Sequence, residues 1–310
     1  MRNYCSVFKV KLWMIAFIIP LASCGSDSGG ESKVLITEEN AIAIAEKSLT
    51  SAEFALVSVS AIADLIEALN VVTASQTINC PGGGTETIQL AGINPSSGLN
   101  SADILTIVDH GCTDIEHLSV TNGELKVLVG NKNGNVFNGR IIFNNYSVEY
   151  NQSDVESIVF DGTTQFNNLR YLDQYMIYDD NTSSSTNKLN ITTTSNSTSN
   201  TITLKGHKIS RELVLNDGDQ YEIEFKGTLL SQDIGGQVEI STPSKLYGTL
   251  DLTPVVGVIE ILGDGGSKVK LIGKDSTYMD IQVEDAAGEL LDIESTYEWT
   301  DVLKGFLWTF

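Results

Sequence analysis

Between Asn40 and Leu69 the hydrophobic residues recur with the period of an α-helix, and no glycine or proline interrupts the stretch. Thr37 is suited to cap its N-terminus, and Glu38 and Glu39 would lie in the first turn, where their charge favours the helix dipole. The apolar positions that share this period are Ile42, Ala45, Leu49, Ala52, Leu56, Val59, Ile62, Ile66 and Leu69. Because this apolar arc is broad, the sequence predicts a helix over residues 37–70 that is covered on most of its circumference. The heptads are too irregular to favour a partner-binding coiled coil.

From about residue 85 to residue 295 the pattern changes to alternation of apolar and polar residues, which is typical of half-buried β-strands. In Tyr221–Leu229, the Tyr, Ile, Phe and Leu residues share one face, and the Glu, Lys and Thr residues share the other. Lys268–Ile272 and Tyr278–Glu284 alternate in the same way. Turn signals such as Asn122-Gly123 separate these segments, so the sequence predicts a long series of antiparallel strands.

Several of the predicted strands carry a glycine at a similar place, and one segment between them is unusually polar. The glycines lie at positions 123, 139, 162, 227 and 248, and their spacing favours a meander of hairpins over a solenoid. The segment Asn181–Thr201 consists almost entirely of Asn, Ser and Thr. Two hypotheses stay open for it: a disordered segment, or an exposed polar hairpin around Asn196, since Thr favours strands.

An apolar sheet face has to be covered, and the predicted helix needs cover as well. The simplest arrangement is an α+β fold in which the long N-terminal helix packs in the concave face of a large, curved antiparallel β-meander. We expect one domain over residues 34–310. An outer-membrane β-barrel is an alternative, because Phe306, Trp308 and Phe310 alternate as in the last strand of such barrels. The barrel is disfavoured because it would leave the helix uncovered.

The N-terminal residues have the layout of a secretory signal peptide. Arg2, Lys9 and Lys11 precede or begin an uncharged apolar stretch, Leu12–Ile19, and small residues follow it. That stretch is shorter than the roughly 20 apolar residues that a membrane-spanning helix needs. We therefore expect residues 1–23 to be removed on export.

Leu21-Ala22-Ser23-Cys24 resembles the lipobox of bacterial lipoproteins, in which an apolar residue and two small residues precede a cysteine. The resemblance implies a thioether-linked diacylglycerol on Cys24, cleavage before it, and an acylated new N-terminus. Two or more acyl chains give a stable anchor, whereas one is marginal. Gly25 implies the outer membrane, and residues 24–33 would form a flexible tether. A plain secreted protein is the alternative.

The body, with its alanine-rich helix, its glycine-marked strands and Trp299 near the C-terminus, is similar to other envelope lipoproteins of Gram-negative bacteria, a resemblance that implies no activity. Of the four cysteines, Cys5 leaves with the signal peptide and Cys24 is lipidated. Cys80 and Cys112 then remain in an oxidising compartment, which predicts a Cys80–Cys112 disulfide. Removal of residues 1–23 takes away three cations and no acid, so the net charge falls from −21 to about −24, which disfavours a nucleic-acid partner.

The sequence contains no recognisable catalytic motif, and its candidate metal sites are weak. It lacks the G-x-S-x-G, H-E-x-x-H and Walker patterns. The stretch from Asp109 to His117 is rich in ligand types, but its spacing fits no zinc pattern. The turns Gly263–Gly266, Asp217–Asp219 and Asp179–Asn181 lack the ligand series of a calcium loop. We therefore expect neither an enzyme nor a cofactor or metal.

These observations predict a lipid-anchored protein of the outer membrane with a non-catalytic structural or binding role. Its acidic, polar sheet surface would face periplasmic or surface partners, such as a protein or a glycan. The alternative is a carrier that holds a lipid or another apolar ligand in the concave face of the sheet. A hydrolytic enzyme is a third hypothesis, and the oligomeric state stays open.

Overall fold

In a computed structural model of the chain, the described residues form mostly antiparallel β-sheet and one short helix, which confirms the predicted sheet. The described ranges are 32–51, 75–92, 100–114, 119–133, 136–150, 157–170, 176–177, 188–195, 197–214, 220–249, 256–291 and 296–299. The chain divides into two compact units. The first consists of Met1–Leu12 and Val57–Ser199, and the second of Trp13–Leu56 and Asn200–Phe310. One continuous domain over residues 34–310 stays a prediction.

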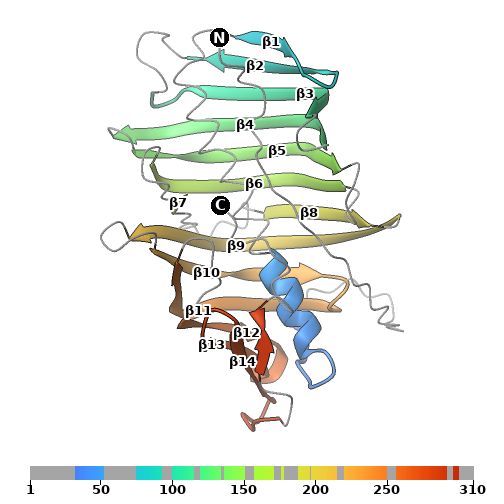
Figure 1. Cartoon of the computed structure of the whole chain (residues 1–310), viewed down its shortest axis with the longest axis vertical. Helices are drawn as coiled ribbons and strands as arrows, with labels where there is room; N and C mark the ends of the chain where they lie inside the picture. The colour runs from blue at the N-terminus through green and yellow to red at the C-terminus, as the bar shows by residue number, and fades with distance from the viewer. Residues whose placement is uncertain are drawn as a thin grey trace. The chain divides into compact units, whose positions relative to one another are not determined.

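The first unit is a meander in which β1 to β6 pair with their neighbours in sequence, all antiparallel (Figure 1). Its last two strands, β7 and β8, both pair with β6. The strands are β1 (Gln76–Asn79), β2 (Thr85–Ala91), β3 (Ile104–Asp114), β4 (Ser119–Asn133), β5 (Val136–Tyr150), β6 (Ser157–Arg170), β7 (Met176–Ile177) and β8 (Lys188–Ser195).

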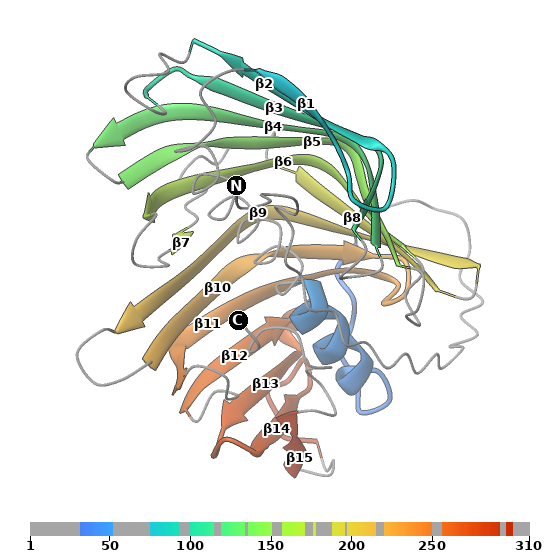
Figure 2. The same cartoon turned by 45° about the horizontal axis from the view of Figure 1, so that its top comes forward.

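Alternate residues of these strands form one apolar face, as the period of two predicts. On β3 and β4 the residues Leu105, Ile107, Leu125 and Val127 are all buried. The face continues through β5, β6 and β8 with the buried residues Ile141, Phe143, Ile158, Phe160, Leu189 and Ile191. The strands bend along their length (Figure 2), and the register shifts within β3–β4, β4–β5 and β5–β6 are the bulges that such bending needs.

The recurrent glycines mark places where an aromatic side chain or a neighbouring backbone approaches closely. Gly139 on β5 is the register partner of Phe166 on β6, and a Cβ at Gly139 would lie 2.5 Å from the Phe166 ring. Gly123 on β4 has φ +105°, and a Cβ there would lie 2.8 Å from the Cα of Tyr146 on β5. A side chain at either position would clash, so Gly139 makes room for an aromatic ring and Gly123 for the backbone of the neighbouring strand.

The polar segment before β9 contains ordered strand, as the hairpin hypothesis expected. β8 pairs with β6, and the hydroxyl groups of Thr194 and Ser199 lie 3.0 Å apart across the turn that holds Ser197. The expectation that this hairpin is exposed is wrong for one face, because Leu189 and Ile191 are buried.

The second unit continues the same pattern. Strands β9 to β15 pair in sequence order, antiparallel throughout, and bend along their length (Figures 1 and 2). They are β9 (Thr198–Val214), β10 (Gln220–Ser231), β11 (Gly236–Thr249), β12 (Val256–Leu262), β13 (Lys268–Gly273), β14 (Tyr278–Glu284) and β15 (Thr296–Glu298), with the 3-10 turn η1 (Asp264–Gly266) before β13. At the last edge Trp299 is fully buried, and its Nε1 donates to the Asp275 carbonyl oxygen (3.0 Å).

The described helix covers residues 41–51. Its first intrahelical hydrogen bond runs from Ala41 N to Thr37 O (3.0 Å), so Thr37 begins the helix as predicted. The Asn40 side chain, and not an acid of the first turn, accepts a hydrogen bond from Thr37 N (2.8 Å). The remainder of the predicted helix, residues 52–70, lies outside the described residues, and packing of the helix in a concave face stays a prediction. No helix among the described residues is long and apolar enough to cross a membrane.

Candidate functional site: a buried acidic pair beside the disulfide

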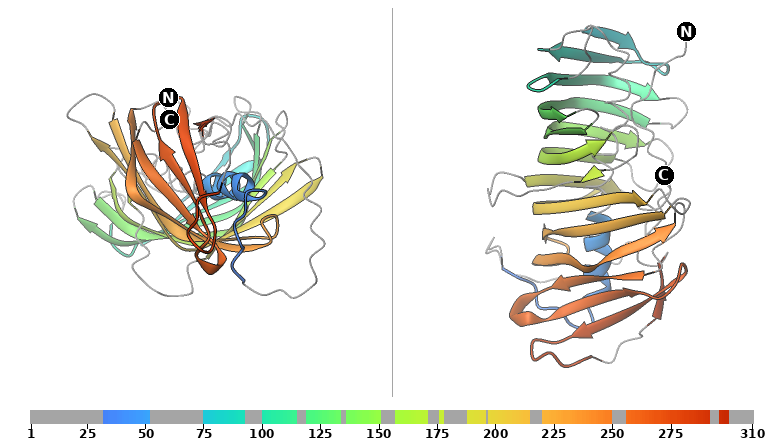
Figure 3. Two further views of the ribbon diagram at one scale, coloured as in Figure 1. Left: turned by 90° about the horizontal axis from the view of Figure 1, so that it is seen from below. Right: turned by 90° about the vertical axis from the view of Figure 1, so that its left-hand side faces the viewer.

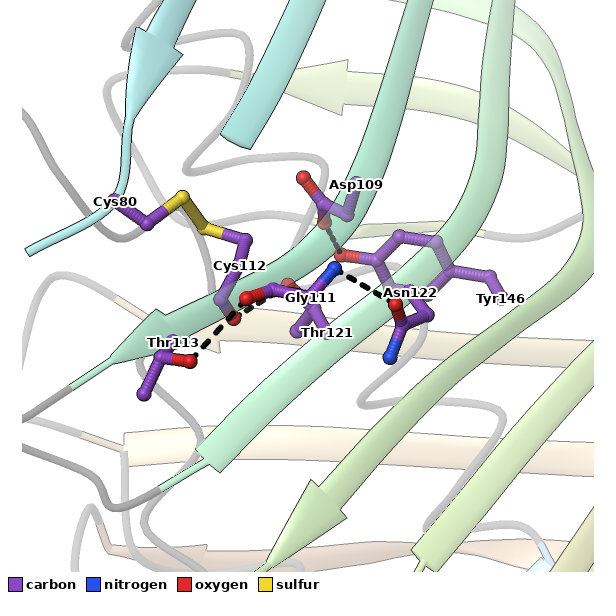
Figure 4. Close-up of a disulfide and its surroundings, with 8 residues drawn as sticks. All are labelled: Cys80, Asp109, Gly111, Cys112, Thr113, Thr121, Asn122 and Tyr146. Atoms are coloured by element: carbon purple, nitrogen blue, oxygen red, sulfur yellow. Dashed lines mark hydrogen bonds between the residues drawn. A yellow bond between two sulfur atoms is a disulfide. The ribbon is translucent and has the colours of Figure 1, made fainter. Parts of the chain in front are cut away.

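Cys80 and Cys112 form the disulfide that the sequence predicted, with Cα atoms 5.3 Å apart and a sequence separation of 32 residues (Figure 4). Cys80 directly follows β1, in the turn that leads to β2, and Cys112 lies in β3. Closing a loop of this length stabilises the folded state by about 3–4 kcal/mol in the chain-entropy model. The bond therefore fixes one end of β2 to β3.

A β-bulge lies next to the disulfide and is held by a side-chain contact. Asp109 pairs with Gly123 and Cys112 pairs with Thr121, so two residues of β3 oppose the single residue Asn122 of β4. The Oδ1 atom of Asn122 accepts a hydrogen bond from Gly111 N (2.7 Å) at the bulge (Figure 4). The bulge and the disulfide together fix where the side chain of Asp109 points.

Asp109 faces a second acid across the strand pair. Glu86 of β2 is its register partner, and the side chains belong to the buried face because Glu86 shares its face with Ile88, and Asp109 shares its face with Ile107. The exposed fractions of Glu86 and Asp109 are 9% and 2%. Two acids at opposite positions on a buried sheet face are unusual, because like charges there destabilise the strand pair. We call Glu86 and Asp109 the acidic pair.

A tyrosine from two strands away donates to this pair. The hydroxyl of Tyr146 on β5 donates a hydrogen bond to Asp109 Oδ2 on β3 (2.8 Å), across β4 (Figure 4). Gly123 of β4 pairs with Asp109, and the absence of a side chain there lets the backbone of Asn145 and Tyr146 approach closely. The second carboxylate oxygen, Asp109 Oδ1, is buried and accepts no hydrogen bond from the described part of the chain.

Burial controls the electrostatics of this cluster. Burial, with the charge of Asp109 as a smaller cause, raises the pKa of Glu86 to about 7. Burial also raises the pKa of Asp109, against the opposing effects of the Tyr146 and Thr121 hydroxyls and of His110. The pKa of Tyr146 lies well above its ordinary value because of burial and the nearby acids. Near neutral pH part of the Glu86 population therefore holds a proton that an exposed glutamate would release.

A carboxyl with a pKa near 7 is suited to proton transfer. However, a catalytic acid must contact its substrate, and Glu86, the carboxyl with that pKa, is only 9% exposed, while Asp109 and Tyr146 are buried more completely. The geometry is that of a buried polar cluster that joins β2, β3 and β5.

Among the other residues that the sequence singled out, those that the structure describes form no common site. His110 is exposed on β3, and the turn at Asp264 is closed by a hydrogen bond from Ser267 Oγ to Asp264 O (2.8 Å). Within the described ranges, no group of three or more His, Cys, Asp or Glu residues is placed to hold a metal ion. Cys24, His117, Asp179–Asn181, Asp217–Asp219, the segment 1–23 and the aromatic residues at 306–310 lie outside the described residues.

Sequence reasoning missed the acidic pair and Tyr146, although one signal was present. Glu86 and Asp109 occupy the apolar positions of their alternating strands, which is where a charged residue is least expected. The cluster joins residues from β2, β3 and β5, and their register was not predictable. Comparisons of the chain with protein-family models, with curated proteins and with solved structures find no match.

Proposed function

We propose that this protein is a lipid-anchored protein of the bacterial cell envelope, attached to the outer membrane through Cys24, with a non-catalytic structural or binding role. The lipobox-like sequence supports the anchor. The Cys80–Cys112 disulfide supports an oxidising compartment, since disulfides persist there and are rare in the cytosol.

The burial of the helix favours a structural role over that of a ligand carrier. None of the described helical residues 41–51 is exposed, and Ala41, Ile44, Ala45, Ser48 and Leu49 are buried. In Figure 3 this helix lies beside β10 to β12, on the side toward which these strands bend. A helix enclosed in this way supports the proposal that the chain fills its own concave face. A ligand would have to displace it.

The segment that follows the tether is fixed to the same unit. Residues 32–36, which we call the strap, form a parallel bridge with β11, in which Val34 N donates to Gln237 O (3.0 Å) and Gln237 N donates to Ser32 O (3.0 Å). Ile36 N donates to the buried Ser267 Oγ (2.9 Å). A pull on the lipid anchor would therefore reach the body through backbone hydrogen bonds on β11 and the turn before β13.

Two ion pairs support this attachment. Lys33 pairs with Glu239 of β11 (2.7 Å), and Lys47 of the helix pairs with Asp233 between β10 and β11 (2.7 Å). Each pair is part-exposed and contributes little by itself, about 0–1 kcal/mol. Together these ion pairs connect both the strap and the helix to the β10–β11 hairpin.

The outward-facing strand residues suit a polar binding surface. Glu222 pairs with Lys245 and Glu224 pairs with Lys208 on neighbouring strands. These contacts leave a net acidic surface because acids outnumber cations, 40 to 19, in the whole chain. Such a surface favours protein or glycan partners over nucleic acid.

Mass spectrometry of the protein purified from its native envelope tests the anchor. We expect an N-terminal peptide that begins at Cys24 and carries acyl chains, and a Cys24→Ser variant that is released into the soluble fraction. An N-terminal peptide without acyl groups, or one that retains residues 1–23, contradicts the proposal. Organic extraction of the same sample tests the carrier alternative, because a stoichiometric lipid that leaves with the extract would show that the concave face is not filled by the chain.

A further inference from the structure

We propose that Glu86 and Asp109 share one proton in the folded protein, and that loss of this proton loosens the β2–β3 strand pair while the adjacent disulfide keeps the two strands together. The acidic pair is thus a reversible pH-sensitive contact built into the sheet. This inference does not depend on the lipid anchor.

The first argument is the register. Glu86 and Asp109 are direct partners on adjacent antiparallel strands, where the Cβ atoms of a pair lie about 4.5–5.5 Å apart. Both side chains lie on the buried face. If both were ionised, two negative charges would face each other at this distance in a poorly solvated place, and one shared proton removes that repulsion.

The second argument is the hydrogen bonding of Asp109. Oδ2 accepts the Tyr146 hydroxyl, but Oδ1 is buried without a donor. The Thr121 hydroxyl is near enough to Asp109 to lower its pKa, but the hydrogen bond that it donates goes to the Cys112 carbonyl oxygen (3.4 Å). A buried acceptor without a donor is costly. The acid form of Glu86, directly across the strand pair, supplies an O–H that can satisfy Oδ1.

The third argument concerns the other groups that act on the acidic pair. Tyr146 stays neutral over the physiological pH range, because its pKa lies well above the ordinary value. His110 follows Asp109 but is exposed on the opposite face of β3. Glu124 on β4 is engaged by Lys126 (2.7 Å) and by Asn144. Among the described residues, no buried cation balances the acidic pair, so a proton is the available positive charge.

The direction of the pH effect follows from proton linkage. The pKa of Glu86 is about 7 in the folded state and 4.5 ordinarily. Between these values the folded state binds more protons than the unfolded state, so the free energy of unfolding falls as pH rises through this window. Below it both states are protonated at Glu86, and above it both are ionised.

The disulfide limits how far the strands separate. Cys80 precedes β2 by a short turn, and Cys112 follows Asp109 by three residues on β3. Backbone hydrogen bonds from Gly82 N to Thr113 O (3.1 Å) and from Thr113 N to Gly83 O (2.9 Å) add to this connection. Loosening at the acidic pair is therefore local, with the ends of the strands still joined.

Thermal unfolding of the purified mature protein tests the proposal over about pH 4.5 to about pH 8. The Glu86→Gln variant keeps the shape of the neutral acid and can donate an N–H to Asp109. Exposed Glu149 on β5, a strand of the same unit, provides the control variant Glu149→Gln. We expect Tm of the wild type and of Glu149→Gln to fall together with rising pH. We expect Glu86→Gln to lose the Glu86-dependent part of that fall and to be the most heat-stable of the three near pH 8. A constant offset between Glu86→Gln and the control over the whole range would overturn the proposal.

A second measurement needs no variant. In wild-type protein with ¹³C-labelled glutamate carboxyls, we expect one resonance, assigned to Glu86, to titrate well above the ordinary glutamate range. Hydrogen exchange in β2 and β3 should quicken over the same pH window, after correction for intrinsic rates, while exchange in β13 and β14 should not. A Glu86 midpoint in the ordinary range, or a uniform change over all these strands, would overturn the proposal.

Discussion

Two cross-strand glutamates, one in each unit, show opposite behaviour. Glu86 of β2 faces Asp109 of β3, and Glu284 of β14 faces Lys268 of β13. Burial raises the pKa of Glu86 to about 7, whereas hydrogen bonds from Lys270 and Lys268 lower the pKa of Glu284. Both residues lie on antiparallel strands of a meander. The difference is that one belongs to the apolar face beside an acid and the other to the polar face between two lysines.

The comparison shows that strand parity and register together decide what a glutamate does in a sheet. Lys268 and Lys270 contact the two carboxylate oxygens of Glu284 at 2.9 Å and 2.6 Å, so that site is balanced within the strands themselves. The acidic pair has no such balance, and it lies instead beside a disulfide, a bulge and a buried tyrosine. We infer that the disulfide holds β2 and β3 together against the repulsion between the two acids, a repulsion that is absent from the β13–β14 pair.

The largest expected effect comes from removal of the disulfide. The double variant Cys80→Ala/Cys112→Ala should lower the free energy of unfolding by about 3–4 kcal/mol, because the unfolded chain regains the entropy of an open loop. Hydrogen exchange should show the loss of protection in β2 and β3 and little change in β13 and β14. An equal loss of protection in β2–β3 and in β13–β14 would contradict the view that the disulfide holds the strands at the acidic pair together.

The next effect comes from a side chain placed between β4 and the backbone of β5 at Gly123. A Gly123→Ala variant places a Cβ 2.4 Å from the Asn145 carbonyl oxygen at φ +105°, so β4 and β5 must separate and the Tyr146–Asp109 hydrogen bond is lost. We expect a loss of about 2–4 kcal/mol in denaturant unfolding. Gly288→Ala is the matched control, since it also has a positive φ (+81°) but meets nothing within 4 Å. Its cost should be limited to the backbone, about 1–2 kcal/mol.

The strands around the two glutamates were predictable from the sequence, but the contacts between the strands were not. In Tyr278–Glu284 the alternation predicts the buried set Met279, Ile281 and Val283, and the structure buries these three. Such a prediction needs only local periodicity, because side chains of a strand alternate between two faces. The disulfide was equally accessible, because removal of Cys5 and Cys24 left one pairing.

The register between neighbouring strands could not be predicted from the sequence. That Glu86 faces Asp109 depends on the register of β2 against β3, which runs without a shift from the Thr85–His110 pair to the Ala91–Ile104 pair. That Tyr146 reaches Asp109 depends on Gly123 being the residue between them. A shift of one residue would move either acid to the solvent face. The glycines were visible as a repeat, but their use as seats for aromatic rings requires the neighbouring strand.

A smaller effect is expected when Tyr146 loses only its hydroxyl. Tyr146→Phe keeps the buried ring and leaves Asp109 Oδ2 without its donor, which should cost about 1–3 kcal/mol. The pKa of Asp109 should rise further, since this hydroxyl lowers it. A ¹³C titration of aspartate carboxyls measures the shift, and Tyr247→Phe in the second unit is the control. An unchanged Asp109 titration would mean that the hydroxyl does not stabilise the carboxylate.

The smallest effect has the opposite sign to that of Glu86→Gln. Glu284→Gln removes two part-exposed ion pairs, so we expect a loss of about 0.2–1 kcal/mol near neutral pH. Because the pKa of Glu284 is lowered in the folded state, its contribution is present above the ordinary value of 4.5 and fades as pH falls below it. The variant and the wild type should therefore converge in acid, and added salt should narrow the gap at neutral pH. A gain in stability at neutral pH, as expected for Glu86→Gln, would show that parity and register do not separate the two glutamates.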